Sequence, residues 1–294
     1  MNSSTATTVF LPIALGVIML GLGLSLTVAD FTRVVRYPRA AAIALGCQIL
    51  VLPAVCLGLV LLFDLEPTLA VGMMLLAASP GGTTANLFSH LARGDVALNI
   101  TLTAVNSVLA VVTLPIVVNL SLAGFLDGDA AIGLQPDKLL QVFAIVLVPV
   151  GLGMLLRNRA PALAERLDRP VKLASVVVLV SVIAVAVYQE RDNVLDYLRS
   201  VGLVALLLCL AGLTIGYLVP RAARVPRGQA VASAFEIGVH NSTLAITIAL
   251  SPALLNSTEM AVPAAVYGII MFFPAGVLAY LLNRRSGDRA LTEA

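Results

Sequence analysis

A single glutamate, Glu236, is the residue of this sequence with the most chemistry to explain. It lies in segment 235–243 (FEIGVHNST), a polar stretch between two apolar runs. An ionised carboxylate at bilayer depth costs about 2.5–3.5 kcal/mol on insertion scales. A membrane chain retains such a group where it meets a cation, a proton or a substrate.

The residues around Glu236 disfavour a continuous helix. Gly238 lowers helix stability, and Asn241, Ser242 and Thr243 can hydrogen-bond their own backbone instead of the helical ladder. The pattern predicts a broken transmembrane helix with a carboxylate at the break.

A second polar interruption occupies segment 79–86 (SPGGTTAN). Pro80 removes a backbone donor and the glycine pair loosens the chain, so helix continuity is not expected. A half-helix beginning after the break would present free N–H groups and a positive dipole end, which suit an anionic group. The alternative is a simple proline kink, which a matching break around Glu236 disfavours.

Asn99, Thr103 and Asn106 fall on one face of the helix that follows, at i, i+4 and i+7. Their oxygens suit a hard cation such as sodium. Interhelical hydrogen bonding is the equal alternative. Gln48, alone in its apolar segment, favours a packing hydrogen bond, and His90 is expected at the membrane interface.

Composition places these residues in a membrane. The 294-residue chain is 60% hydrophobic and 12% charged, with a mean hydropathy of +1.01, whereas soluble domains carry about a quarter charged residues. The chain is therefore predicted to be an all-α polytopic protein whose partner is the lipid bilayer, with no nucleic-acid partner. Cys47, Cys56 and Cys209 lie in apolar runs and predict neither a disulfide nor a transition-metal site.

Nine segments are long and apolar enough to span a bilayer, which needs about 20 residues. The first is interpreted as a retained span and not as a cleaved signal peptide. The predicted spans are 9–28, 39–63, 67–92, 96–125, 138–156, 171–188, 200–219, 228–250 and 260–282.

The distribution of positive charge predicts the orientation. One set of loops holds 15 of the 18 Lys and Arg residues, and the other set holds only Lys138, Arg191 and Arg199. The N-terminus is therefore expected outside and the C-terminus in the cytoplasm. The 15 are Arg33, Arg36, Arg39, Arg93, Arg157, Arg159, Arg166, Arg169, Lys172, Arg221, Arg224, Arg227, Arg284, Arg285 and Arg289.

The order of spans repeats with opposite polarity. Repeat one covers about 9–125, a spacer helix covers 138–156 and repeat two covers about 171–283, and each repeat contains a broken helix followed by another span. Inverted repeats with matching broken helices are typical of secondary transporters whose site lies near the midplane.

With these residues in view, the sequence resembles the bile acid:sodium symporter family in its nine-span form, without the extra first helix of some bacterial members. The resemblance rests on segments 80–83 (PGGT) with Asn86, 91–94 (LARG) and 236–239 (EIGV) followed by Asn241-Ser242, and it runs over nearly the whole chain.

The resemblance implies a panel domain and a core domain, with the two broken helices crossing in the core. It implies two sodium ions behind the crossing and the substrate in front. The ligands implied for one ion are Asn86, Asn99, Thr103 and Glu236. Those implied for the other are Gln48, Glu236, the backbone around Ile237 and Val239, and His240. The residues implied to face the substrate are Thr83, Thr84, Asn241 and Ser242.

Two positions depart from the family pattern. Ala85 stands where relatives often have a serine ligand, and His240 stands where the family usually has a glutamine. A neutral imidazole offers nitrogen, which a hard cation disfavours, and an imidazolium offers no lone pair. We expect the second sodium site to be weak or absent, with acid pH competing there. In the alternative, His240 simply packs against or bonds another helix.

The sequence thus predicts a sodium-driven importer of a small organic anion in the cell membrane, working by alternating access, with sodium as coupling ion and no cofactor. A proton-coupled carrier using Glu236 and His240 is one alternative. An intramembrane hydrolase is a remote one, because the sequence lacks both His-Glu-x-x-His and Gly-x-Ser-x-Gly.

Overall fold

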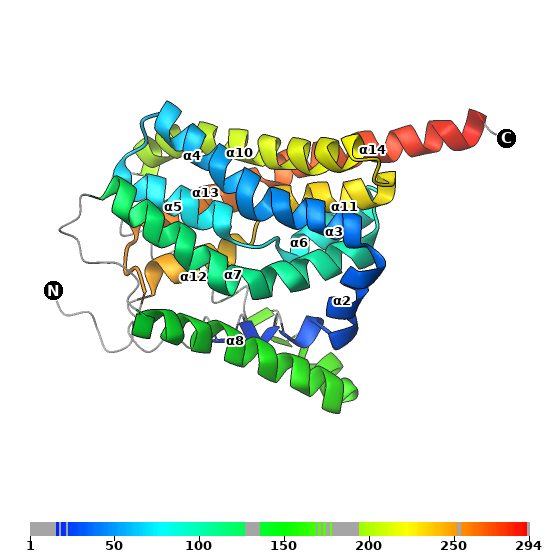
Figure 1. Cartoon of the computed structure of the whole chain (residues 1–294), viewed down its shortest axis with the longest axis horizontal. Helices are drawn as coiled ribbons and strands as arrows, with labels where there is room; N and C mark the ends of the chain where they lie inside the picture. Colours follow the sequence, from blue (N-terminus) through cyan, green and yellow to red (C-terminus); the bar gives the residue numbers. More distant parts are fainter. Residues whose placement is uncertain are drawn as a thin grey trace.

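The computed structural model describes residues 16–17, 19–21, 23–126, 136–168, 170–171, 173–174, 177, 194–251 and 254–292. Within these ranges the ordered elements are helices, and the only strand-like pairing is one isolated bridge. The helices run side by side along the long axis of the molecule, with α8 (Pro136–Arg159) at its lower edge (Figure 1). The all-helical fold class is confirmed for these residues.

Four of the described helices are long and apolar enough to cross a membrane. Large apolar side chains such as Leu62 and Phe273 are more than three-quarters exposed on them, as expected for surfaces that face lipid. The count of nine spans stays a prediction, and residues 9–15 and most of the expected span 171–188 lie outside the described residues. The four candidates are Pro38–Leu62, Val96–Phe125, Arg199–Ala222 and Glu259–Arg284.

Two membrane helices are interrupted where the polar segments predict it. The first consists of α5 (Pro67–Ala78) and α6 (Thr83–Leu91), and the second of α11 (Arg227–Gly238) and α12 (Ser242–Leu250). Each pair is a helix of 12 residues followed by one of nine. In the first gap Ser79 has an extended backbone (ψ 147°) and precedes a proline, which disfavours the helical conformation at that residue.

The two interruptions lie against each other. The Gly82 amide donates to the Val239 carbonyl at 2.9 Å, and the Asn241 amide donates to the Pro80 carbonyl at 2.9 Å. Unpaired backbone groups at this depth would each cost several kcal/mol. Backbone N–H and C=O groups of each interruption therefore find hydrogen-bond partners in the other. The pairing forms an isolated antiparallel bridge between Gly81 and His240.

Glycines bring α10 (Val194–Ala222) close to α11. A Cβ on Gly212 would lie 2.7 Å from the Ile237 carbonyl oxygen, and one on Gly216 would lie 2.8 Å from that of Ser233. Small residues four apart allow such backbone approach in membrane helices. These contacts hold α11, which carries Glu236, close to α10.

The second span contains a widened turn that the sequence pattern did not predict. It consists of α3 (Pro38–Gly46), a π-helical turn (Cys47–Val51) and α4 (Leu52–Leu62). Pro53 lacks an N–H and its ring crowds the carbonyl four residues earlier, which favours this turn. The turn carries Gln48, which is buried.

Two predicted span boundaries differ from the structure. The last span divides at Met271 into α13 (Val262–Ile270) and α14 (Phe272–Thr292) and extends past residue 282. The first span, predicted to end at 28, stops being helical at residue 25, and α2 (Val28–Thr32) begins after a capping box formed by Thr27 and Asp30.

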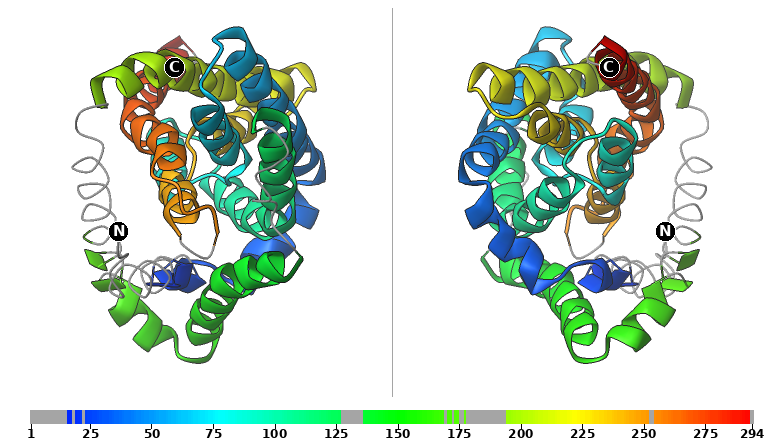
Figure 2. Two further views of the ribbon diagram at one scale, coloured as in Figure 1. Left: turned by 90° about the vertical axis from the view of Figure 1, so that its left-hand side faces the viewer. Right: turned by 90° about the vertical axis from the view of Figure 1, so that its right-hand side faces the viewer.

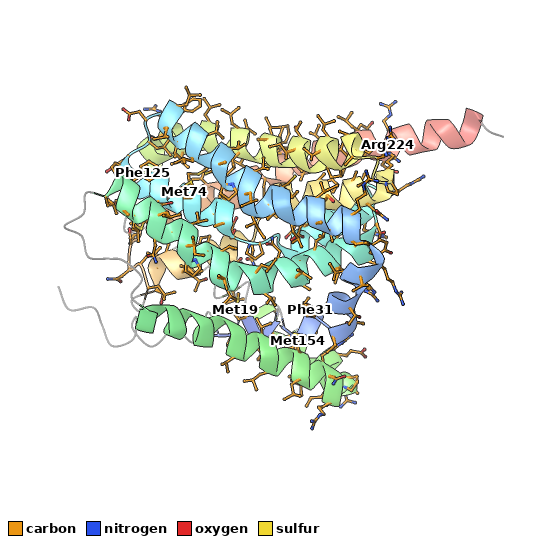
Figure 3. The ribbon with its side chains drawn as sticks, viewed as in Figure 1. Met19, Phe31, Met74, Phe125, Met154 and Arg224 are labelled. Atoms are coloured by element: carbon orange, nitrogen blue, oxygen red, sulfur yellow. The ribbon has the colours of Figure 1, made fainter. Side chains whose placement is uncertain are left out.

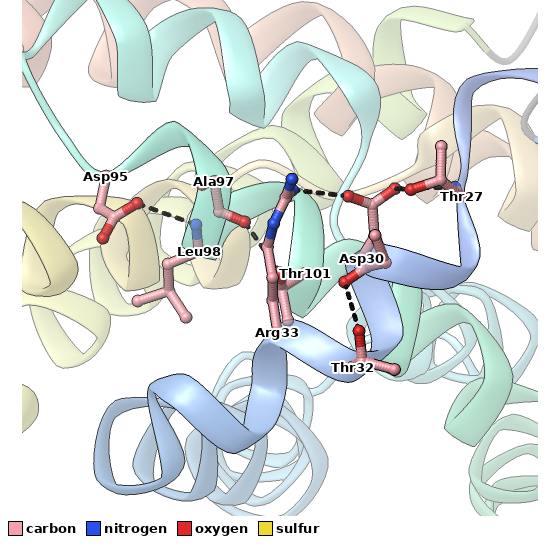
Figure 4. Close-up of polar contacts among 9 residues, drawn as sticks. Thr27, Asp30, Thr32, Arg33, Asp95, Ala97, Leu98 and Thr101 are labelled. Carbon is pink, nitrogen blue, oxygen red and sulfur yellow. Dashed lines mark hydrogen bonds and ion pairs between the residues drawn. The ribbon is translucent and has the colours of Figure 1, made fainter.

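The polar network at α2 lies near the start of α7 (Val96–Phe125) (Figure 4). Asp30 accepts hydrogen bonds from the Thr27 amide and hydroxyl, both at 2.7 Å, and pairs with Arg33 at 2.8 Å. Asp95 caps α7 by accepting from the Leu98 amide at 3.0 Å.

The helices around the interruptions form one group, and α8 with the helical residues 16–17, 19–21 and 23–25 forms another (Figure 2). Within the second group a Cβ on Gly153 would lie 2.6 Å from the Leu20 carbonyl oxygen, so these two helices also approach closely. Phe125 and Arg224 mark opposite ends of the helix bundle (Figure 3).

Candidate functional site

The carboxylate of Glu236 lies where the two interruptions meet α7. Its side chain is 1% exposed. Oε1 accepts from the Gly81 amide at 3.2 Å, and Oε2 accepts from Thr103 Oγ1 at 2.6 Å and Asn99 Nδ2 at 3.3 Å. The three donors come from two elements far from residue 236 in sequence, so the fold assembles this cluster.

None of these donors is charged. Among the described residues, Glu236 forms no ion pair with a basic side chain. Hydrogen bonds alone offset only part of the cost of burying an ionised carboxylate. The arrangement is therefore suited to receiving a positive charge from outside the protein.

Asn99 and Thr103 are brought together on α7 as their spacing predicts. Asn99 Nδ2 also donates to the Ala232 carbonyl at 3.1 Å, which ties α7 to α11. Thr103 Oγ1 lies 3.1 Å from the Asn99 carbonyl. Asn106 is one turn further along and lies near the carboxylate, but its Nδ2 has no hydrogen-bond partner among the described residues.

Two of the amide oxygens implied as sodium ligands are buried without a donor in the described part of the chain. They are Asn86 Oδ1 on α6 and Asn99 Oδ1 on α7. A buried polar atom without a partner is costly and calls for an explanation such as an ion or a water. Neutral amide oxygens and carboxylates are the ligand types that a hard cation prefers.

A second polar cluster surrounds the Ser79 carbonyl. It accepts from Gln48 Nε2 at 3.0 Å and contacts His240 Nδ1 at 3.0 Å. Because a carbonyl only accepts, this contact requires a proton on Nδ1, and in the neutral imidazole it leaves a lone pair on Nε2. Gln48 Oε1 and His240 Nε2 are both buried and have no partner among the described residues.

Backbone groups complete the surroundings of His240. The Val239 carbonyl accepts from the Gly82 amide, as described above, and among the described residues its second lone pair has no donor. The side chain of Ile237 is fully buried. The Gly238 carbonyl at the end of α11 accepts from Tyr267 Oη at 2.9 Å, and the Tyr267 ring packs edge-on against the imidazole.

The four residues implied to face the substrate lie at the starts of α6 and α12. Thr83 is exposed and Thr84 is half-buried. Asn241 Oδ1 caps α12 by accepting from the Leu244 amide at 3.1 Å. Ser242 is buried, and its hydroxyl lacks a partner among the described residues.

Two contacts of the candidate site were missed from the sequence because backbone atoms make them. The Gly81 amide and the Ser79 carbonyl contact the residues whose side chains were singled out. The glycine pair and the adjacent proline were the available signal, because they free the backbone of the first interruption for such contacts. Asp30 and His90 are polar but separate from this site; His90 is exposed, and its position at the membrane interface stays a prediction.

Comparison with known proteins agrees with a transporter. Residues 12–197 match the family model described as the Sodium Bile acid symporter family. A Bacillus subtilis protein described as the uncharacterized sodium-dependent transporter YocS is 28% identical over 94% of this chain and 84% of its own length.

Two eukaryotic relatives are similar over most of the chain. The probable sodium/metabolite cotransporter BASS1 of Arabidopsis thaliana, described as chloroplastic, is 28% identical over 96% of this chain and 68% of its own length. The human ileal sodium/bile acid cotransporter is 25% identical over 84% of this chain and 71% of its own length.

The apolar helices, the family match and these relatives define a multi-pass membrane transporter coupled to sodium, and not an enzyme. The family match covers more than half of the residues, and the chain belongs to the sodium bile acid symporter family.

Proposed function

We propose that this protein is a symporter that uses sodium to import a small organic anion by alternating access. The observation that carries the proposal is the buried Glu236 carboxylate, which has three uncharged donors and no basic partner among the described residues. A sodium ion would supply the missing charge.

The first sodium ion is assigned to Asn86, Asn99, Thr103 and Glu236. Support comes from the convergence of Asn99 and Thr103 on the carboxylate and from the two amide oxygens without donors. In the structure Asn99 presents its Nδ2 group to the Glu236 carboxylate. To bind the ion, the side-chain amide of Asn99 would turn so that its Oδ1 atom faces the ion.

The second site, if occupied, would use Gln48, Glu236, the backbone of Ile237 and Val239, and His240. Gln48 Oε1 is available there. The imidazole offers nitrogen and holds the Ser79 carbonyl, so we propose that this site binds sodium weakly or not at all.

The substrate is assigned to the space in front of the crossing, lined by Thr83, Thr84, Asn241 and Ser242. Two half-helices begin there, and their N-terminal N–H groups and dipoles favour an anionic group. Sodium behind the crossing would hold both interruptions in place and so complete the anion site.

The nine-span inverted repeat remains part of the proposal. The equal lengths of the broken helices, 12 and nine residues in each half, support it. The separate pair formed by α8 and the described residues between 16 and 25 would belong to the panel domain. The proposed orientation in the cell membrane has the N-terminus outside and the C-terminus in the cytoplasm, so sodium entry would gain about 2.3 kcal/mol per charge per 100 mV.

A thermal-shift screen of organic anions, run with and without sodium, tests this function. Ligands that bind the native state raise the unfolding temperature. We expect at least one carboxylate or sulfonate to stabilise the protein only when sodium is present. Equal stabilisation by that anion in sodium and in choline would contradict sodium coupling.

A further inference from the structure

Gly81 makes the backbone contact closest to the Glu236 carboxylate. Its amide donates to Oε1 at 3.2 Å. A Cβ added at Gly81 would collide with the carboxylate carbon and both of its oxygens. The carboxylate therefore occupies the space that a side chain at residue 81 would fill.

Backbone conformation does not account for this glycine. No described glycine has a positive φ, so alanine can adopt the backbone conformation of Gly81. The neighbouring Gly82 gives a matched comparison, because a Cβ there would lie 3.3 Å from the His240 carbonyl oxygen and 3.6 Å from Asn241 Cα. The two glycines share one interruption, but only Gly81 faces the carboxylate.

The opposite side of the carboxylate is also occupied. Thr103 and Asn99 hold Oε2 from α7, at 2.6 and 3.3 Å. A side chain at residue 81 would push the carboxylate toward these two residues or force it to turn away. Binding sites depend on ligand positions held to within about 0.5 Å, so either movement would disturb the ligand set.

We propose that Gly81 is a positioning residue for Glu236. Its missing side chain leaves room for the carboxylate, and its amide holds Oε1 so that Oε2 is presented to Thr103 and Asn99. This inference rests on the proposed sodium-binding role of Glu236, and it assigns the first interruption a part in setting the affinity for the ion.

Sodium-dependent stabilisation of the purified full-length protein tests the inference. The unfolding temperature is measured against sodium chloride concentration, with choline chloride holding ionic strength constant. We expect Gly81→Ala to raise the half-saturating sodium concentration roughly tenfold, and Gly82→Ala to raise it much less. Equal shifts in the two variants would overturn the positioning role.

A rescue experiment separates positioning from general damage. Glu236→Asp withdraws the carboxylate by one methylene and so makes room for a Cβ at residue 81. Each single variant should weaken sodium binding, and the combined Gly81→Ala/Glu236→Asp variant should be weakened by less than the product of the two single effects. A fully multiplicative result would contradict the proposal.

Two further outcomes are distinguishable. If Gly81→Ala does not yield folded protein, adding Glu236→Ala should restore folded yield, and failure to restore it would contradict the carboxylate as the cause. If Glu236→Asp alone leaves the sodium response unchanged, the proposed sodium role of Glu236 fails. If it alters that response but Gly81→Ala does not, only the positioning role fails.

Discussion

Asp30 and Glu236 are both buried carboxylates, with side chains that accept hydrogen bonds from neighbouring residues, but the charges around them differ. Asp30 is 5% exposed, is capped by Thr27 and pairs with Arg33 at 2.8 Å. Glu236 is 1% exposed and has only the uncharged donors Gly81, Asn99 and Thr103.

The difference supports the proposal that Glu236, unlike Asp30, binds a ligand. The Asp30 cluster is complete in itself, because its partners lie within three residues along the chain and include a cation. The Glu236 cluster draws its donors from the first interruption and α7, 133 to 155 residues away in sequence, and still lacks a positive charge. Neutralising Glu236 should therefore impair transport, whereas neutralising Asp30 should lower the stability of the protein.

The largest effect is expected for Glu236→Gln. This change keeps the size of the side chain but removes the charge that the ion would neutralise. A loss of about 3 kcal/mol corresponds to more than about 100-fold in sodium affinity. Uptake driven by a sodium gradient should fall to background in proteoliposomes, and undiminished sodium-driven uptake would sink the mechanism.

A smaller effect is expected for Thr103→Val, which removes the hydroxyl 2.6 Å from Oε2 without changing the shape of the side chain. Hydrogen bonds to charged groups contribute about 1.5–3 kcal/mol, so the sodium concentration for half-maximal uptake should rise roughly tenfold or more. Thr101→Val is the matched control, because among the described residues the Thr101 hydroxyl bonds only its own helix, at Ala97. Similar shifts in both variants would show that the Thr103 hydroxyl has no special part.

His240→Gln should change the steepness of the curve of uptake against sodium concentration more than the sodium concentration at its midpoint. Glutamine offers a carbonyl oxygen where the imidazole offers nitrogen, so the second site should gain sodium affinity. Uptake against sodium concentration at several pH values should be steeper in this variant, and less sensitive to acid pH than in the wild type. A Hill coefficient near two without pH dependence in the wild type would show that His240 has not altered coupling.

The smallest effect on sodium binding is expected for Asp30→Asn. Loss of the pair with Arg33 and weakening of the α2 cap should lower the free energy of unfolding by about 1–2 kcal/mol. The half-saturating sodium concentration should stay at the wild-type value. A shift as large as that of Thr103→Val would mean that the two clusters are coupled.

The sequence was informative where polar residues interrupt apolar runs. Glu236 and both interruptions could be located because charge, proline and glycine are costly in a membrane helix, and the spacing of Asn99 and Thr103 placed them on one helical face. The roles of these residues as ligands, and the domain division, stay predictions.

Tertiary contacts could not be predicted in the same way. The glycine pair and the proline indicate that the backbone of the first interruption is free, but they do not indicate that the Gly81 amide meets Glu236 or that the Ser79 carbonyl joins Gln48 to His240. The π-helical turn at Gln48 and the division of the last span at Met271 were not predicted either, although Pro53 favours the turn.

Direct binding of radioactive sodium to the purified protein tests the central claim, that Glu236 is the charged ligand of the coupling ion. The account predicts saturable binding in the wild type, the same binding in Asp30→Asn, and none above background in Glu236→Gln. Saturable binding in Glu236→Gln with the wild-type affinity would contradict it.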